Sequence, residues 1–331
     1  MYADDANILI TRNSNAEIEK IFTKLAKNFE TWVNSNGLVI NLKKTNYMIF
    51  ANRTVQDLPF TPKLFKYEIE RKRVARFLGV IINEKLTWKD HALSVKAKMS
   101  RYVGILFKLK KILPLTARKN IYYSVVQSYL NYCSLVWGLG SKSNIEPLFT
   151  EQKKAIWSLM PGYNSNYYKN GLTPCHTKTF FTEHKIQTVH SIILTKILVF
   201  MHKFHNSRHY IPNLVANLIP MNAPKDIDDA ENCKEWLASY STQKLRNALS
   251  FKGPLFYMKY FPEIMSQGSD INVYMSVNSF KTQAKSFVLN IQTEGRPMVW
   301  EGQNTPLYYV PGLPRSSREN IPKISYIGDL D

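Results

Sequence analysis

The chain has 331 residues, and its 44 Lys and Arg against 25 Asp and Glu give a formal net charge of +19. Such an excess, interleaved with 13% aromatic residues, favours a polyanionic partner that is bound through phosphate attraction and base stacking. The three cysteines form no Cys-x-x-Cys pair, which argues against a disulfide partner and a zinc knuckle. With no secretory signal and no apolar run of membrane-spanning length, we expect an intracellular protein, nuclear or cytoplasmic, without a membrane partner.

Two adjacent carboxylates, Asp4 and Asp5, follow Tyr2 and Ala3 at the amino end, with an apolar run just behind them. Hard dications such as Mg²⁺ take oxygen ligands, and a pair of them can hold the attacking and leaving oxygens of phosphoryl transfer. Two carboxylates on a tight turn between strands suit that task. The alternative is a solvated polar corner whose carboxylates bond nearby backbone amides.

The first 84 residues are predicted to mix helix and strand. Ser14 and Glu17 have the form of a capping box, and apolar residues then recur with helical spacing, which predicts a helix from Ser14 to Asn36. The predicted strands are residues 8–10, 47–50 and 76–83. Two prolines in residues 56–67 predict a loop there.

From Trp88 onward the apolar period is helical. The predicted helices are residues 88–111, a second one capped by Thr116, 145–159, 186–206 and a shorter one that starts at 278. The first three are short-linked and amphipathic, which is typical of a small bundle. A polar loop at 161–171 separates them from the rest, and the tail after residue 292 lacks any period and is expected to be poorly ordered.

Several short motifs follow one another along the chain in a recognisable order. They are Tyr-Ala-Asp-Asp at 2–5, Trp-Val-Asn-Ser-Asn-Gly-Leu at 32–38, Asn-Leu-Lys-Lys-Thr at 41–45, Arg-Phe-Leu-Gly-Val at 76–80, Leu-Thr-Trp-Lys-Asp-His at 86–91, Tyr-Cys-Ser-Leu-Val-Trp-Gly at 132–138 and Glu-Gln-Lys-Lys-Ala-Ile at 151–156. In this order the chain resembles the reverse transcriptases of non-LTR retrotransposons, most closely the jockey-like group. The looser similarity continues to about residue 289.

The resemblance implies an α+β fold. Residues 1–84 are then the C-terminal half of a polymerase palm, made of short antiparallel strands and a helix. Residues 85–160 are a thumb-like helical bundle, 161–291 a mostly helical C-terminal region, and 292–331 a poorly ordered tail.

The resemblance also implies roles for the residues near the amino end. Asp4 and Asp5 are the expected Mg²⁺ ligands of two-metal nucleotidyl transfer, Asp4 the more direct of the two. Tyr2 and Ala3 are expected beside the incoming nucleotide or the primer end. Lys44 resembles a lysine that approaches the triphosphate, where a positive charge offsets the charge building on the leaving oxygens. The alternative for Lys44 is an exposed lysine at the start of a strand.

Two further segments are candidates for binding nucleic acid. Phe77, Leu78 and Gly79 resemble the primer grip, a hairpin that positions the primer terminus, and Gly79 permits a close backbone approach because it has no side chain. The alternative for Phe77 and Leu78 is plain strand core. The basic residues predicted to follow a template and primer backbone are Lys96, Lys98, Arg101, Lys108, Lys110 and Lys111. Their alternative is an ordinary solvated helix face.

A cluster of His202, His205 and His209 invites interpretation as a metal site. Basic residues between the imidazoles, and the lack of a nearby Cys or carboxylate, instead favour a hydrated or nucleic-acid-facing helix end.

A complete enzyme of this family carries fingers and a further palm aspartate before the Asp pair. None of the chain's other aspartates follows an apolar strand. We therefore expect a C-terminal fragment of an RNA-directed DNA polymerase that is inactive alone, with an RNA template, a DNA primer and deoxynucleoside triphosphates as partners of the complete enzyme. An unpaired sheet edge beside Ile8 and Ile10 is expected to promote aggregation. The alternative function is a non-enzymatic RNA- or DNA-binding module of the element ribonucleoprotein.

Overall fold

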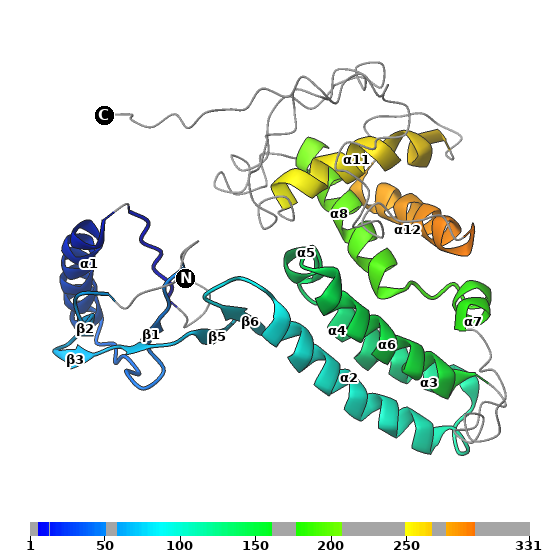
Figure 1. The fold of residues 1–331 in the computed structure, drawn as a ribbon, viewed down its shortest axis with the longest axis horizontal. Helices are drawn as coiled ribbons and strands as arrows, with labels where there is room; N and C mark the ends of the chain where they lie inside the picture. Colours follow the sequence, from blue (N-terminus) through cyan, green and yellow to red (C-terminus); the bar gives the residue numbers. More distant parts are fainter. Residues whose placement is uncertain are drawn as a thin grey trace. The chain divides into compact units, whose positions relative to one another are not determined.

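The computed structural model describes residues 6–12, 14–50, 58–160, 177–206, 249–266 and 276–294. Helices and short strands both occur (Figure 1), as an α+β protein requires, and the chain divides into two compact units, residues 1–159 and 160–331. Among the described helices, none has the length and apolar character needed to cross a membrane. The finer division into palm, thumb and C-terminal region stays a prediction.

Helix α1 (Asn15–Ser35) begins and ends as the sequence predicts. The Glu17 N–H donates to Ser14 Oγ at 3.3 Å, so a side chain satisfies one of the helix's unpaired amides. At the other end Gly37 has a φ of +60°, a conformation that costs glycine little and reverses the chain direction. Ala26 and Val33 supply the buried face of the helix.

Six short strands in the described part of the chain form three separate two-stranded ladders. They are β1 (Asn46–Tyr47), β2 (Lys63–Leu64), β3 (Tyr67–Glu68), β4 (Glu70–Arg71), β5 (Val74–Phe77) and β6 (Val80–Asn83). The β2–β3 and β5–β6 ladders are antiparallel, whereas β1 and β4 pair in parallel. The parallel pair was not predicted, because its two strands are joined by a long segment that contains a hairpin of its own.

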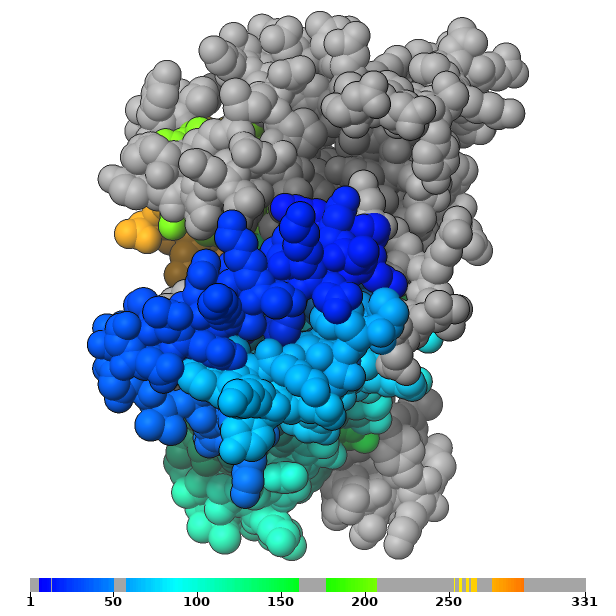
Figure 2. Space-filling view, turned by 90° about the vertical axis from the view of Figure 1, so that its left-hand side faces the viewer, coloured from blue at the N-terminus to red at the C-terminus, as the bar shows by residue number. Residues whose placement is uncertain are grey.

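Several local predictions in this region are wrong. The strand predicted at 47–50 is confined to Asn46–Tyr47, and the strand predicted at 76–83 reverses direction as the β5–β6 hairpin. Residues 6–12 are described but form no strand, and Leu9 is 82% exposed, since none of the described strands pairs with this segment. The predicted loop at 56–67 contains the β2–β3 hairpin, whose turn residues Phe65 and Lys66 both have positive φ. The Phe65 N–H donates to Glu30 Oε1 of α1, which places the hairpin beside the helix (Figure 2).

The rest of the first unit is a helical bundle. Its elements are α2 (Lys89–Leu109), α3 (Leu115–Ile121), the π-helix η1 (Tyr122–Gln127), α4 (Ser128–Asn131), α5 (Ser134–Trp137) and α6 (Lys142–Leu159). Met99 and Leu106 of α2 and Leu148 and Ile156 of α6 are fully buried and form its core. Thr116 lies inside α3 and does not cap it, because the helix already starts at the residue after Pro114.

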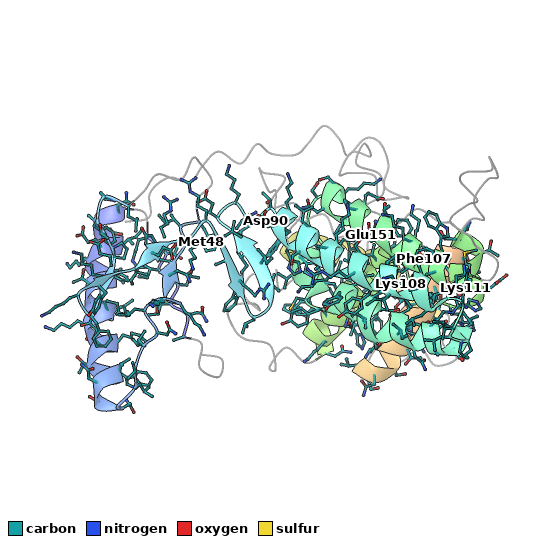
Figure 3. The ribbon with its side chains drawn as sticks, turned by 90° about the horizontal axis from the view of Figure 1, so that it is seen from below. Met48, Asp90, Phe107, Lys108, Lys111 and Glu151 are labelled. Carbon is teal, nitrogen blue, oxygen red and sulfur yellow. The ribbon has the colours of Figure 1, made fainter. Side chains whose placement is uncertain are left out.

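Buried polar side chains fix how α6 sits in the bundle. Glu151 (Figure 3) accepts a hydrogen bond from Ser100 Oγ of α2 at 3.4 Å and pairs with Lys154 at 2.8 Å. The neighbouring Gln152 donates from Nε2 to the hydroxyl of Tyr122 in the π-helix at 2.9 Å. Because buried polar groups require partners, these contacts select one register of α6. They give the Glu-Gln motif at 151–152 a structural role.

The second unit contains α7 (Thr177–Glu183), α8 (Val189–Asn206), α11 (Leu249–Ser266) and α12 (Val277–Glu294). Helix α11 was not predicted, because Pro254 and Pro262 lie within it and proline normally ends a helix. The poorly ordered tail was predicted to begin at residue 292, but helix α12 continues to Glu294. Gln292 accepts hydrogen bonds from the Thr188 N–H and from Ser191 Oγ, and it donates to the Ile186 carbonyl, so it fastens α12 to the start of α8. Residues 295–331 lie outside the described part.

Arg118 closes the carboxyl end of α6. Its guanidinium donates to the carbonyls of Ser158 at 2.5 Å, Leu159 at 3.3 Å and Leu113 at 3.2 Å. The carbonyls of a last helical turn have no partner within the helix and carry the negative end of the helix dipole. A buried guanidinium therefore satisfies several of these acceptors at once.

We predict that Arg118→Met lowers the free energy of unfolding by about 2–3 kcal/mol, because it leaves buried carbonyls without donors. Urea denaturation followed by circular dichroism measures this change. The control is Arg101→Met on the exposed face of α2, expected to change stability by less than about 0.5 kcal/mol. Equal effects of the two substitutions would show that the Arg118 contacts do not stabilise the bundle.

Candidate nucleic-acid interface

The predicted metal ligands, Asp4 and Asp5, lie outside the described residues. The neighbouring Tyr2 and Ala3 also lie outside them, and so does His209 of the histidine cluster. In the part of the chain that the structure describes, no three His, Cys, Asp or Glu side chains gather closely enough to hold a metal ion. The carboxylates of Asp4 and Asp5 match Mg²⁺ only in the chemistry of their oxygen donors.

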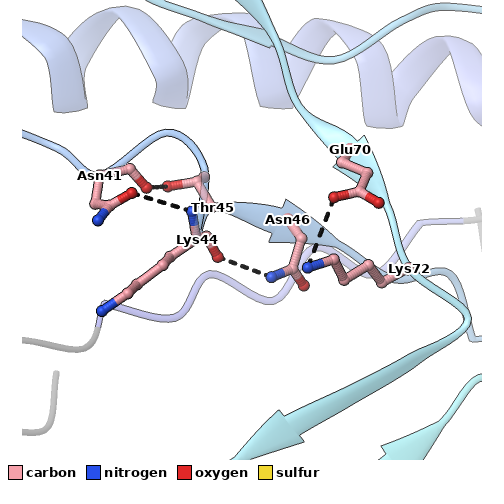
Figure 4. A network of polar contacts seen from close by, with 6 residues as sticks. All are labelled: Asn41, Lys44, Thr45, Asn46, Glu70 and Lys72. Atoms are coloured by element: carbon pink, nitrogen blue, oxygen red, sulfur yellow. Dashed lines mark hydrogen bonds and ion pairs between the residues drawn. The ribbon is translucent and has the colours of Figure 1, made fainter.

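Lys44 lies on a tight turn that leads into β1. Its backbone N–H donates to Asn41 Oδ1 at 3.2 Å, and Thr45 Oγ1 donates to the Asn41 carbonyl at 3.0 Å. The Asn46 side chain then donates to the Lys44 carbonyl at 2.9 Å. These contacts fix the Lys44 backbone, while its exposed side chain extends away from the network (Figure 4). The Asn-Leu-Lys-Lys-Thr motif therefore presents a lysine on a rigid turn.

The primer-grip segment forms the tip of the β5–β6 hairpin. Phe77 pairs with Val80, so Leu78 and Gly79 alone make the turn, with φ of +43° and +79°. Positive φ at both positions defines the turn type that matches the twist of the flanking strands. Phe77 and Leu78 are 39% and 37% exposed, so the core interpretation does not account for them. An apolar tip projects toward solvent.

Two side chains of the helical bundle hold this hairpin. The Tyr132 hydroxyl donates to the Leu78 carbonyl at 2.6 Å. On β6, the Ile81 N–H donates to Nδ1 of His91, a residue in the first turn of α2, at 3.2 Å. Both residues belong to motifs that carry the resemblance, but their contact with the hairpin could not be predicted from the sequence.

His91 is buried and must be neutral to accept the Ile81 hydrogen bond. Its Nε2 finds no hydrogen-bond partner among the described residues. Burial, and secondarily the nearby positive charge of Lys98, lowers the pKa of His91 below its usual value near 6.5. The hairpin contact therefore depends on an uncharged imidazole.

Unusual backbone conformations concentrate around the hairpin. Leu78, Leu86, Trp88 and Cys133 account for four of the seven positive-φ residues other than glycine in the described part of the chain. Such conformations cost about 1–3 kcal/mol each and persist where the surroundings over-determine them. Hydrogen bonds around these residues supply the constraints. Trp137 Nε1 donates to the Tyr132 carbonyl at 2.8 Å, and the Asn144 side chain donates to the Thr87 carbonyl at 2.6 Å. The Asn83 side chain contacts both Thr87 and Asp90.

The predicted basic face divides in the structure. Arg101, Lys108 and Lys111 are exposed, and Lys108 and Lys111 lie toward the carboxyl end of α2 (Figure 3). Lys96 is half-buried, and the Lys98 ammonium lies 5.4 Å from the centre of the Tyr129 ring. Lys110 instead donates to the Trp157 carbonyl at 3.3 Å, and burial together with Arg118 lowers the pKa of Lys110 to about 8.

His202 of α8 does not lie at a hydrated helix end. His202 is fully buried, with its ring stacked on Phe280 at a centroid distance of 3.9 Å. Its Nδ1 lies 3.1 Å from the Tyr257 hydroxyl and its Nε2 lies 3.0 Å from Asn206 Nδ2. The interpretation as a nucleic-acid-facing residue is therefore wrong for His202, which belongs to the core of the second unit.

Comparison with known proteins confirms the resemblance to jockey-like reverse transcriptases. The chain is 25% identical over 161 residues to the RNA-directed DNA polymerase from mobile element jockey of Drosophila melanogaster, a match that covers 47% of this chain and 17% of that protein. Probable RNA-directed DNA polymerases from transposon BS and from transposon X-element of the same organism are each 24% identical, over 52% and 46% of this chain and 19% and 17% of their own lengths. The chain thus spans less than a fifth of these relatives. No protein-family model and no solved structure matches it.

We predict that the stability of the first unit falls as the pH drops below about 6.5, the unperturbed His value. Since the folded pKa of His91 is lowered, the unfolded chain takes up a proton before the folded one does, and stability rises with pH through this window. Urea midpoints measured between pH 5 and 8 test the slope.

The variant for this test is His91→Gln, whose side-chain carbonyl still accepts a hydrogen bond but does not titrate. It should show a shallower pH slope than the parent protein. An unchanged slope would assign the pH dependence to other groups.

Proposed function

We propose that this chain is part of an RNA-directed DNA polymerase of a retrotransposon and that it contributes a surface for the primer–template duplex. One observation carries the proposal. Three motifs of the resemblance, at 76–80, 86–91 and 132–138, meet at the hairpin. His91 accepts a hydrogen bond from the Ile81 N–H, which directly follows the first motif, and Tyr132 binds the Leu78 carbonyl from 54 residues along the chain. Relatives that match about half of the chain are named as RNA-directed DNA polymerases, from mobile element jockey and, as a probable one, from transposon BS.

The proposal assigns a role to each part of the first unit. Residues up to 84 are the palm portion, and the bundle from α2 to α6 is the thumb. The β5–β6 hairpin, at the end of the palm portion, contacts the primer end. An exposed apolar tip is otherwise unfavourable in water, and stacking against a nucleotide would cover it. The exposed cations of α2 then neutralise backbone phosphates.

The catalytic assignment rests on the sequence and the relatives. Asp4 and Asp5 would hold Mg²⁺, which would stabilise the charge on the reacting phosphate oxygens when bound. Lys44 lies on a hydrogen-bonded turn before β1, and its side chain would direct a positive charge at a polyphosphate. A two-metal site draws a further carboxylate from a neighbouring strand, and none of the chain's other aspartates follows an apolar strand in the sequence.

A non-enzymatic nucleic-acid-binding module is the second candidate function. The helical bundle has a core of its own, with Met99, Leu106, Tyr122 and Leu148 fully buried, and it carries the exposed cations. Binding by this part requires none of the residues before α2. Activity and binding therefore have to be measured separately.

We predict that the 331-residue protein binds an RNA–DNA primer–template duplex with a steep salt dependence. In Lys108→Gln/Lys111→Gln the slope of log K against log salt should fall by about 2, because about one unit is lost with each phosphate contact. Fluorescence anisotropy of a labelled duplex at several salt concentrations measures the slope.

The matched control is Lys20→Gln/Lys24→Gln, which removes the same charge from exposed positions of α1. This control should leave the slope nearly unchanged. Equal losses in both pairs would mean that net charge alone drives binding and that α2 holds no interface.

We also predict that the same protein, supplied with a DNA primer on an RNA template, Mg²⁺ and deoxynucleoside triphosphates, extends the primer no faster than a protein-free control. The reason is that no other aspartate of this sequence follows an apolar strand, so we expect no third carboxylate to complete a two-metal site with Asp4 and Asp5. Gel analysis of a labelled primer measures extension. Incorporation that disappears in Asp4→Ala would overturn the proposed inactivity and establish this chain as a polymerase.

A further inference from the structure

Residues on both sides of the contact between Tyr132 and the hairpin tip fit each other closely. The Tyr132 hydroxyl donates to the Leu78 carbonyl at 2.6 Å. A Cβ added at Gly79 would lie 3.2 Å from a ring carbon and 3.3 Å from the hydroxyl of Tyr132, closer than a side chain tolerates without displacement. Gly79 therefore serves two purposes, since it adopts the positive φ of the turn and leaves room for the tyrosine ring.

Tyr132 itself is held firmly. Its carbonyl accepts a hydrogen bond from the buried Trp137 Nε1 at 2.8 Å. The next residue, Cys133, has a φ of +49°, which interrupts the helix between α4 and α5. The position of the hydroxyl is thus set by the core of the bundle. Because His91 binds the hairpin at Ile81, on the following strand, the tip is fixed at two separate points.

A purely stabilising role explains this contact poorly. Tyr132 is 51% exposed, so it buries little apolar surface, and the two-residue turn already matches the twist of its strands. What the hydroxyl determines is the orientation of the Leu78 carbonyl and, with it, of the exposed tip. Loss of that one hydrogen bond leaves the fold intact but lets the tip change direction.

We propose that Tyr132 is a positioning residue that aligns the hairpin tip with the cations of α2, so that a bound primer end meets the tip in one orientation. This inference rests on the proposed function, since it names the duplex terminus as the ligand of the tip. Affinity comes from the phosphate contacts of α2, whereas placement of the terminus comes from the tip. The two properties are therefore separable by substitution.

The test uses the full 331-residue protein and an RNA–DNA duplex with 2-aminopurine as the 3′-terminal base of the primer and a dye on the template. Anisotropy of the dye reports affinity, and 2-aminopurine fluorescence reports how the terminal base is stacked. In Tyr132→Phe we expect affinity within twofold of the parent protein and at least half of the bound-state change in 2-aminopurine fluorescence to be lost.

Two further variants complete the design. Gly79→Ala crowds the same contact from the hairpin side and should reproduce the fluorescence loss. Tyr67→Phe makes the same chemical change at a 64% exposed residue of β3 and should leave both signals as in the parent.

The outcomes separate this inference from the proposed function. If the parent protein fails to bind the duplex, the proposed function is wrong and the inference falls with it. If the parent binds and Tyr132→Phe retains the full fluorescence change, the duplex-binding function stands and the positioning role is overturned. Parallel losses of affinity and fluorescence would likewise overturn it, because they would make Tyr132 an ordinary contributor to binding energy.

Discussion

The direction of the β5–β6 hairpin depends on two hydrogen bonds that join it to the helical bundle, from Tyr132 to the Leu78 carbonyl and from the Ile81 N–H to His91. Each contributes about 1 kcal/mol, and the Ile81 amide, which lies in a partly buried place, would cost more than that if it were left unpaired. The short strands bury too little surface to fix their own direction. Their placement beside α2 is consequently set by these polar contacts.

The same junction explains why strained backbone collects there. Leu86 and Trp88 adopt left-handed conformations on the way into α2, and Cys133 does so between α4 and α5. Their cost is offset because Trp137 is buried and bonded to Tyr132, while Asn144 binds the Thr87 carbonyl. Strain retained at one place by several independent contacts indicates a demand for one precise geometry. A surface that receives a duplex end has such a demand, whereas simple packing does not.

Local features of the fold were predictable from the sequence, and long-range ones were not. The Ser14 cap and the period of α1 and α2 depend on neighbours within a few residues, so their helices were found to within one or two residues. The parallel β1–β4 pair and the burial of His202 depend on partners far along the chain, Tyr257 and Phe280 for the histidine. In the candidate site, the tip was predicted from its motif, but a half-exposed tyrosine 54 residues away gives no sequence signal that it contacts the tip.

The division of the basic residues follows from helix geometry as much as from charge. Arg101 and Lys108 are seven residues apart and share a face of α2, whereas Lys110 lies nine residues from Arg101, about half a turn around. That turn directs Lys110 to the carboxyl end of α6, where Arg118 also binds carbonyls. Burial, together with the repulsion from Arg118 at the same helix end, lowers the pKa of Lys110 to about 8, yet both cations find acceptors at the negative end of the dipole. Charge committed to that helix end is unavailable to phosphates, which leaves Arg101, Lys108 and Lys111 as the exposed cations of the predicted basic face.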